Sequence, residues 1–161
     1  MYNLSFLVFD TETTGLPDNF NVAASPITME NWDRCRMVQI AWRIYSAEKE
    51  LTTSSCHIIK LEGFAIPDAS TVIHKITTEM ALAKGLPISD VLGNLFDDIK
   101  AYGVETTVAH NIKFDNNVVM SEIYRTGDDH LVSIWTSLKR HCTMLSNKSL
   151  FGGRWPKLSV L

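Results

Sequence analysis

Short apolar runs alternate with polar, turn-rich stretches along the first third of the chain. Residues 4–9 (LSFLVF) are almost wholly apolar and end at Asp10, which is typical of a central strand buried on both faces. Residues 37–45 and 51–61 predict two further strands, and the short link between them predicts a hairpin. The polar stretch 17–36 predicts a long loop, and loops of this length in compact domains are often functional or mobile.

The second half of the chain shows the period of amphipathic helices, interrupted by short apolar runs. We expect helices over 77–84, capped by Thr77 or Thr78, 89–102, capped by Ser89, 114–126 and 130–139. We expect strands over 106–109 and 140–145, and 156–161 has the pattern of the first turns of another helix. Five apolar residues share one face of the helix predicted over 89–102: Val91, Leu92, Leu95, Phe96 and Ile99.

This order of elements predicts the fold class. Three strands in a meander, followed by alternating helices and strands, indicate an α/β fold with a mixed sheet flanked by helices. The helix that begins at residue 156 is incomplete at residue 161. The order is similar to that of the ribonuclease-H-like architecture.

Composition indicates the general class of protein but not its function. The 161 residues, 45% apolar and 20% charged, predict a single globular domain over 1–161. The net charge of −3 gives no sign of nucleic-acid binding by bulk electrostatics, although metal ions can bridge an acidic protein to a polyanion. Three scattered cysteines, an early first strand and the lack of an apolar run of about 18 residues predict a cytoplasmic protein with reduced thiols, without signal peptide or membrane span.

Two carboxylates, Asp10 and Glu12, follow the first apolar run. Residues i and i+2 of a strand point to the same face, so these side chains are expected side by side at the carboxyl edge of the sheet, where ligands bind in open α/β folds. Their mutual repulsion would be relieved by a divalent cation, and hard oxygen ligands favour Mg²⁺ or Mn²⁺. The alternative is a solvated strand end with a turn-forming Asp.

A third carboxylate occurs in VAHNIKFDNN, residues 108–117, where a predicted strand leads into a helix. Asp115 lies in the first helical turn, and an adjacent strand would bring it opposite Asp10. Three carboxylates would then converge on one or two metal ions. The alternative for Asp115 is an ordinary acidic residue at a helix N-terminus.

Several stretches taken together resemble one family. FDTETTG (9–15) and AHNIKFD (109–115) are similar to the first two motifs of the DnaQ-like (DEDD, DEDDh type) 3′–5′ exonucleases, which have a ribonuclease-H-like fold. VIHKIT (72–77) resembles the family's HGIT loop, with Lys75 in place of glycine. RWPKLSVL (154–161) resembles the segment before the family's last motif, so the resemblance extends over nearly the whole chain.

The resemblance implies hydrolysis of the 3′-terminal phosphodiester of DNA or RNA with two ions, Mg²⁺ or Mn²⁺. It implies that Asp10 bridges both ions, that Glu12 helps to bind the ion holding the attacking water, and that Asp115 holds the other ion mostly through water. Candidate substrate-binding residues are Thr13, Thr14, Gly15, Leu16, His74 and Ile76. Asn111 is expected to brace the second motif through backbone bonds. Trp32 is a candidate base-stacking residue, whereas Trp42 is expected in the core.

The sequence departs from the family at its last motif. It has no HxAxxD, and YRTGD (124–128) matches Tyr-x-x-x-Asp but begins only nine residues after Asp115, too close to swing back to the metals. We therefore expect a C-terminally truncated exonuclease domain of weak activity, or a divergent protein that takes the missing helix from a partner chain. The alternatives are a non-catalytic nucleic-acid-binding module and a polymerase-associated proofreading subunit; a homo-oligomer also remains open.

Overall fold

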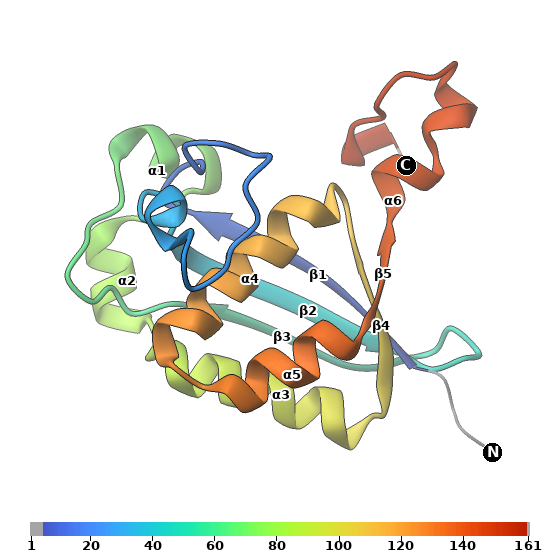
Figure 1. Ribbon diagram of the computed structural model, residues 1–161, viewed down its shortest axis with the longest axis horizontal. Coiled ribbons are helices and arrows are strands. Elements are labelled where there is room, and N and C mark those ends of the chain that lie inside the picture. Colours follow the sequence, from blue (N-terminus) through green and yellow to red (C-terminus); the bar gives the residue numbers. More distant parts are fainter. Residues whose placement is uncertain (1–4, 161) are drawn as a thin grey trace.

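The computed structural model describes residues 5–160 of the chain. Its strands form one sheet in the order β3-β2-β1-β4-β5, with β1 at the centre (Figure 1). They are β1 (Ser5–Thr13), β2 (Met37–Tyr45), β3 (Leu51–Ile58), β4 (Val104–Ala109) and β5 (Lys139–Cys142). β1, β2 and β3 are antiparallel neighbours, whereas β4 is parallel to β1 and β5 is parallel to β4. The predicted mixed α/β sheet is therefore confirmed.

The central strand is longer than the apolar run that predicts it. β1 pairs with β2 along its length, from Phe6 opposite Tyr45 to Thr13 opposite Met37. Asp10 and Glu12 therefore lie within the strand rather than after it. Its pairing with β4 is shorter and ends at Val8 opposite Val108, so the last residues of β1 extend beyond β4.

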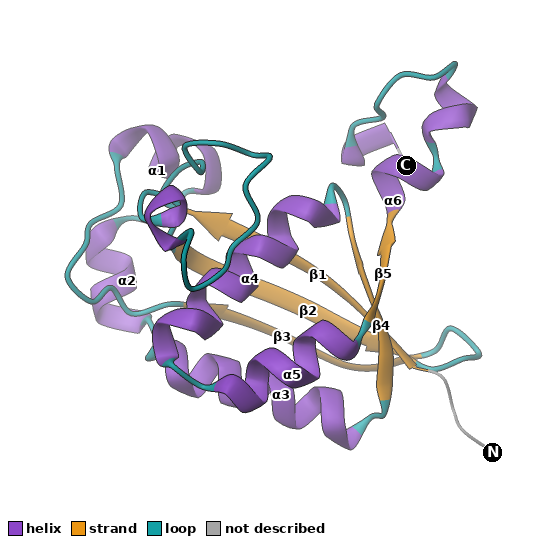
Figure 2. Cartoon of the chain, in the orientation of Figure 1, coloured by secondary structure: helices purple, strands orange, loops and turns teal. Residues whose placement is uncertain are grey.

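Three helices cover one face of the sheet: α3 (Ile88–Ala101), α4 (Ile112–Thr126) and α5 (Asp129–Ser137) (Figure 2). The apolar face predicted for α3 is buried in this core at all five positions, Val91, Leu92, Leu95, Phe96 and Ile99. Trp135 of α5 joins the layers, because its ring packs edge-on against Phe9 of β1 with a centroid distance of 5.4 Å. Trp42 of β2 is buried as predicted and donates its indole N–H to Asp98 of α3 at 2.8 Å.

Two short helices follow β3 in the chain: α1 (Asp68–His74) lies at the carboxyl end of β1, and α2 (Thr78–Lys84) ends beside the residues that follow β3 (Figure 1). Thr77 caps α2 as predicted, since its hydroxyl accepts the Met80 N–H at 3.1 Å. α1 was not predicted, because its one buried residue is Ser70 and it leaves Val72 and Ile73 exposed. Apolar periodicity cannot reveal a helix of this kind.

Some predicted boundaries are wrong. The residue before α3 is Pro87, and Ser89 lies in the first turn, where its hydroxyl donates to Asp90 instead of capping the helix. The strand predicted over 140–145 ends at Cys142, and its remainder forms α6 (Thr143–Ser146). The chain continues through a 3-10 turn, η2 (Lys148–Phe151), to a second one, η3 (Leu158–Val160), where the sequence predicts the start of a helix.

Among residues 5–160, no helix combines the length and the apolar character that crossing a membrane requires.

Candidate functional site

Asp10 and Glu12 lie on one face of β1, and the residues that alternate with them, Leu7, Phe9 and Thr11, are buried against the helices. Asp10 is exposed and Glu12 is half-buried. Burial raises the pKa of Glu12, and the negative charge of Asp10 raises it further. The surrounding protein also raises the pKa of Asp10, although its side chain keeps contact with solvent. The two carboxylates therefore repel each other in partly desolvated positions.

Asp115 reaches the same region from the first turn of α4, and its residue is only 3% exposed. Its Oδ1 accepts two hydrogen bonds from Thr11, one from the backbone N–H at 3.0 Å and one from the hydroxyl at 2.7 Å. Burial raises the pKa of Asp115 to about 7; the Thr11 bonds oppose this rise, and the charge of Asp10 adds to it. Asp10 thus repels both Glu12 and Asp115. Sequence reasoning missed Thr11, because nothing in the sequence marks where β4 stops pairing with β1.

The chemistry of these donors fits a magnesium-like ion. All three are carboxylates, the hard oxygen ligands that Mg²⁺ and Mn²⁺ prefer, and a divalent cation would relieve the repulsion around Asp10. In the part of the chain that the structure describes, no three His, Cys, Asp or Glu side chains gather closely enough to hold an ion by themselves. Mg²⁺ is commonly bound by one or two carboxylates, with water and substrate phosphates completing its shell. The site fits that open mode rather than a closed protein cage.

The turn after β1 is held by backbone and side-chain bonds. Thr14 donates two hydrogen bonds to carbonyls of the long loop, from its N–H to Arg36 at 2.9 Å and from its hydroxyl to Arg34 at 2.9 Å. A Cβ on Gly15 would lie 3.1 Å from that same Arg34 carbonyl, so the missing side chain allows the loop to approach closely. Leu16 follows with 61% of its surface exposed.

Helix α1 supports the same turn from the other side. Ser70 donates its hydroxyl to the Thr14 carbonyl at 2.7 Å. The Nδ1 of His74 accepts the Ile76 N–H at 3.1 Å, while its Nε2 is buried without a hydrogen-bond partner in residues 5–160. Burial lowers the pKa of His74, with the Thr13 backbone acting in the opposite direction. A neutral imidazole therefore stands beside the turn.

Three of the predicted site residues have structural roles here. Ile76 is 4% exposed and packs in a separate apolar cluster, so the structure assigns it to packing rather than to contact with a substrate. The Asn111 side chain makes no capping bond; its contribution to α4 is a left-handed backbone at φ 58°, not the predicted brace. Trp32 is 1% exposed, so the prediction that it stacks on bases is wrong.

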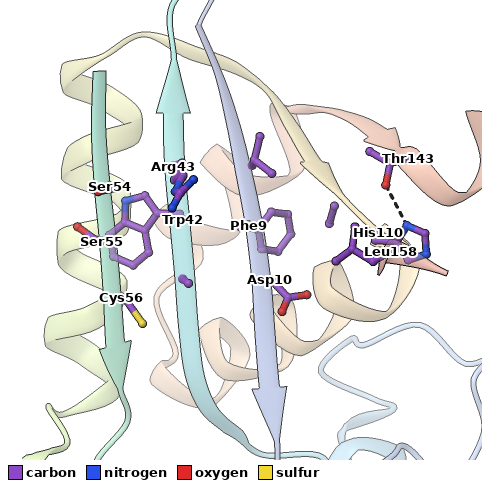
Figure 3. Close-up of a pocket in the computed structure, with 13 residues that line it drawn as sticks. Phe9, Asp10, Trp42, Arg43, Ser54, Ser55, Cys56, His110, Thr143 and Leu158 are labelled. Carbon is purple, nitrogen blue, oxygen red and sulfur yellow. Dashed lines mark hydrogen bonds between the residues drawn. The ribbon is translucent and has the colours of Figure 1, made fainter. Parts of the chain in front are cut away.

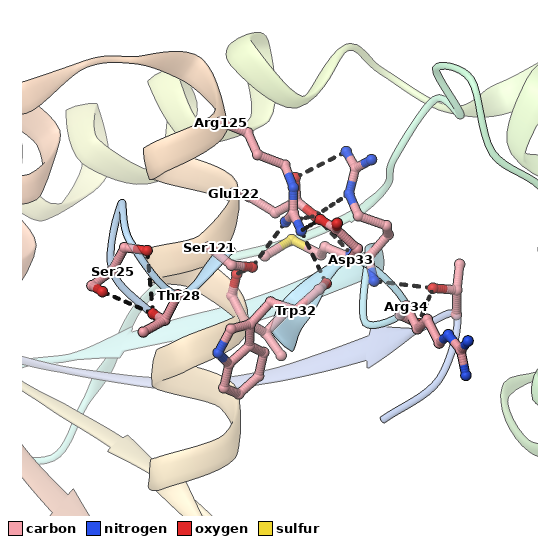
Figure 4. Close-up of polar contacts among 12 residues, drawn as sticks. Ser25, Thr28, Trp32, Asp33, Arg34, Ser121, Glu122 and Arg125 are labelled. Atoms are coloured by element: carbon pink, nitrogen blue, oxygen red, sulfur yellow. Dashed lines mark hydrogen bonds and ion pairs between the residues drawn. The ribbon is translucent and has the colours of Figure 1, made fainter. Parts of the chain in front are cut away.

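The long loop is fastened to α4 by a buried carboxylate (Figure 4). Glu122 is 1% exposed and accepts bonds from the Arg36 guanidinium at 2.9 and 3.2 Å and from the Met37 N–H at 3.0 Å. Arg125 lies 3.3 Å from the same carboxylate and donates to the Trp32 carbonyl at 2.9 Å. The last turn of this loop is therefore tied to the helix that carries Asp115.

On the face of the sheet that α3, α4 and α5 leave open, Asp10 borders a pocket of about 410 Å³ (Figure 3). His110, directly after β4, lines this pocket and contacts the C-terminal segment 143–160, with its Nδ1 3.1 Å from the Thr143 hydroxyl and its Nε2 3.0 Å from the Pro156 carbonyl. Leu158 of that segment lines the same pocket. His110 also lowers the pKa of Asp10, against the larger effect of burial. It therefore links the carboxylate region to the C-terminal segment.

The Tyr-x-x-x-Asp match at 124–128 has a purely structural place. Tyr124 lies in the last turn of α4, and Gly127 ends that helix in a left-handed conformation at φ 71°. Asp128 caps α5, since its carboxylate accepts the N–H groups of His130 at 2.9 Å and Leu131 at 3.2 Å. Its exclusion as a catalytic motif agrees with this geometry.

Comparison with known proteins shows similarity in fold. No protein-family model matches the chain, and no curated protein matches it. A product-bound structure of exonuclease I superposes with a TM-score of 0.71 at 18% identity, over 96% of this chain and 34% of that one. E. coli exonuclease I in complex with a 5cy-dA13 oligonucleotide matches with the same score and identity, over 96% of this chain and 32% of that one.

A zinc-bound form of the E. coli exonuclease I–ssDNA complex also matches, with a TM-score of 0.71 and 19% identity over 96% of this chain and 32% of that one. The chain thus spans about a third of the length of these structures. At this level of identity the likeness establishes a shared fold.

The Glu122 cluster gives a prediction for stability. Glu122→Gln keeps the shape of the side chain but leaves Arg36 and Arg125 without their shared counter-charge. Removing one partner of a buried pair costs about 3–5 kcal/mol, and we expect a loss of about 3 kcal/mol in the free energy of unfolding by urea titration. Glu105→Gln is the control, because its pair with Lys139 at 3.6 Å is exposed and worth no more than about 1 kcal/mol. Equal losses of unfolding free energy in the two variants would contradict a stabilising role of the Glu122 contacts.

Asp115 gives a prediction for pH. The pKa is raised from 3.8 to about 7 on folding, so the folded state binds the proton more tightly and this group's contribution to stability is lost as pH rises through that window. Without metal, Asp115→Asn should flatten the fall of unfolding free energy between these pH values, by on the order of a few kcal/mol in total. The exposed Asp97 serves as control, since Asp97→Asn should leave the profile unchanged. Superimposable profiles for wild type and Asp115→Asn would refute the assignment.

His110 gives a prediction for the C-terminal segment. His110→Ala removes both contacts to this segment, each worth about 0.5–1.5 kcal/mol. Amide hydrogen exchange over residues 143–160 should then be about 10-fold faster, while exchange in α3 stays unchanged. His130→Ala, at an exposed position on α5, provides the comparison and should leave both regions as they are. Unaltered exchange over 143–160 in His110→Ala would show that other contacts hold the segment.

Proposed function

We propose that the chain is a metal-dependent 3′–5′ exonuclease domain that acts on single-stranded nucleic acid. The observation that carries this is the placement of Asp115 against β1, where its Oδ1 accepts two hydrogen bonds from Thr11, the residue between Asp10 and Glu12. The fold shared with exonuclease I supports the proposal, and so do the oligonucleotide complexes of that protein. Single-stranded DNA is therefore the first substrate to test.

The roles proposed for the three carboxylates are those that the family resemblance implies. Asp10 would serve both ions, and Glu12 and Asp115 would each serve one of them; the negative charge of Asp10, which raises the pKa of both other carboxylates, is in keeping with this division. When bound, such ions lower the pKa of the attacking water and stabilise the charge on the leaving 3′-oxygen. The protein contributes the fixed placement of the oxygens: β1 sets Asp10 and Glu12 two residues apart, and Thr11 holds Asp115.

The end of the nucleic acid would lie against the turn after β1. The exposed Leu16 offers an apolar surface for the terminal base, and the neutral His74 stands beside the Thr13 backbone. The turn is fixed by the long loop and by α1, so it can position a nucleotide without first becoming ordered.

Two histidines of the site bear on the activation of the attacking water. His110 is engaged with Thr143 and Pro156, and His74 with Ile76, so neither is placed as a free general base in this arrangement. General-base catalysis typically contributes about 10²–10⁴-fold, and we expect slow cleavage by the chain on its own. A non-catalytic nucleic-acid-binding module is the second candidate, favoured by the lack of a compact three-ligand group within residues 5–160.

The test uses a 5′-labelled single-stranded DNA oligonucleotide with Mg²⁺ or Mn²⁺. The wild-type chain should produce a ladder that shortens from the 3′ end, and EDTA should abolish it. Asp10→Ala should lower the rate more than about 100-fold, because it removes the ligand shared by both ions. Asp97→Ala, which changes an exposed acid on α3, should cleave like the wild type.

Two outcomes would count against the enzyme. Undiminished cleavage by Asp10→Ala would show that this carboxylate takes no part in the reaction. Binding of the oligonucleotide by the wild type without any ladder, at high protein concentration and with either ion, would favour the non-catalytic module.

A further inference from the structure

The Thr11–Asp115 contact occupies a defined place in the sheet. Pairing between β1 and β4 ends at Val8 opposite Val108, three residues before Thr11. The Thr11 N–H is therefore beyond the last strand partner on that side, and the Asp115 side chain takes the position of the missing acceptor. A buried N–H without an acceptor is costly, so this bond is required by the strand as well as useful to the carboxylate.

The hydroxyl adds a second bond from the same residue. Both donors of Thr11 converge on Oδ1 of Asp115, at 3.0 Å from the nitrogen and 2.7 Å from the hydroxyl. Two bonds to one oxygen fix the rotation of the carboxylate and leave Oδ2 as the oxygen that Thr11 does not hold. Thr11 is 6% exposed and β-branched, so its own rotamer is restricted in the strand and its hydroxyl is already aimed.

The position of Thr11 in the chain couples the position of Asp115 to that of the two carboxylates on β1. Thr11 lies between Asp10 and Glu12, with its side chain on the opposite face of β1. Any movement of β1 that shifts Asp10 and Glu12 therefore also shifts the donors that hold Asp115. Thr11 therefore keeps the Asp115 carboxylate at a fixed position relative to its two neighbours in β1.

We propose that Thr11 is the positioning residue of this site: it orients the Asp115 carboxylate toward the ion that Asp115 would share with Asp10. The inference deepens the proposed function and rests on it. Partners of this kind, which bond a ligand without touching the metal, typically change metal affinity by about 10–100-fold when they are removed.

The experiment measures Mn²⁺ binding by the full chain, from the loss of the free-ion electron paramagnetic resonance signal. Thr11→Val keeps the shape of the side chain and removes the hydroxyl donor, and it should weaken Mn²⁺ binding about 10-fold or more. Thr11→Ser restores the donor and should restore the affinity. Thr107→Val is the matched control: Thr107 is a 1% exposed threonine on β4 whose hydroxyl donates to the Lys139 carbonyl, and its loss should leave Mn²⁺ binding unchanged.

A second readout separates positioning from general stability. In the nuclease assay, Thr11→Val should raise the Mn²⁺ concentration for half-maximal rate by more than it lowers the rate at saturating Mn²⁺. A variant that is only less stable would show the same Mn²⁺ dependence as the wild type in its folded fraction. Thermal unfolding without metal reports that fraction directly.

The outcomes distinguish this inference from the proposed function. If Asp115→Asn weakens Mn²⁺ binding and Thr11→Val does not, the role of Thr11 is overturned and the metal site stands. If Asp115→Asn also binds Mn²⁺ like the wild type, the role of Thr11 and the metal site fail together. If Thr11→Val and Thr11→Ala both fail to fold while Thr107→Val folds, Thr11 serves the fold alone and the proposal is overturned.

Discussion

The two hydrogen bonds from Thr11 to Asp115 join parts of the chain that are 104 residues apart, and the candidate site depends on them. β1 would place Asp10 and Glu12 side by side in any sheet, because the two-residue period of a strand requires it. Bringing Asp115 against the same strand requires that pairing with β4 end early and that α4 begin where β1 still has a donor to offer. The site is therefore a consequence of unequal strand lengths at the centre of the sheet.

The segments on the two sides of the carboxylates differ in how many hydrogen bonds hold them. On one side the turn after β1 is fixed by Ser70 and by the long loop, and that loop is fixed in turn by Glu122. On the other side the C-terminal segment reaches the carboxylate region through His110, and Leu150 and Leu158 in this segment remain exposed. A substrate bound at the turn would meet a preformed surface, whereas the pocket beside Asp10 is bordered by a segment held through few bonds.

Much of the fold follows from local pattern, and the limits of the pattern have physical causes. The helix over 89–102 and the strand over 37–45 were predictable because their apolar residues recur with the period of the element and become buried. α1 was not, because it buries one serine and exposes its apolar residues. Asp10, Glu12 and Asp115 stand out by type and spacing, but Thr11 does not, because its role depends on where pairing between β1 and β4 stops. Trp32 was misjudged, since a residue in a polar loop gives no local sign that the loop folds back over the core.

The two edges of the sheet differ from its centre in length and composition. β5 has four residues, of which Lys139, Arg140 and His141 are exposed, and β3 carries a run of threonines and serines. Unpaired strand edges invite edge-to-edge association with other chains, and short, basic or polar edges oppose it. The sheet thus has its most buried apolar strands in the middle and ends in short, basic or polar edges, which oppose edge-to-edge association of the chain with other copies.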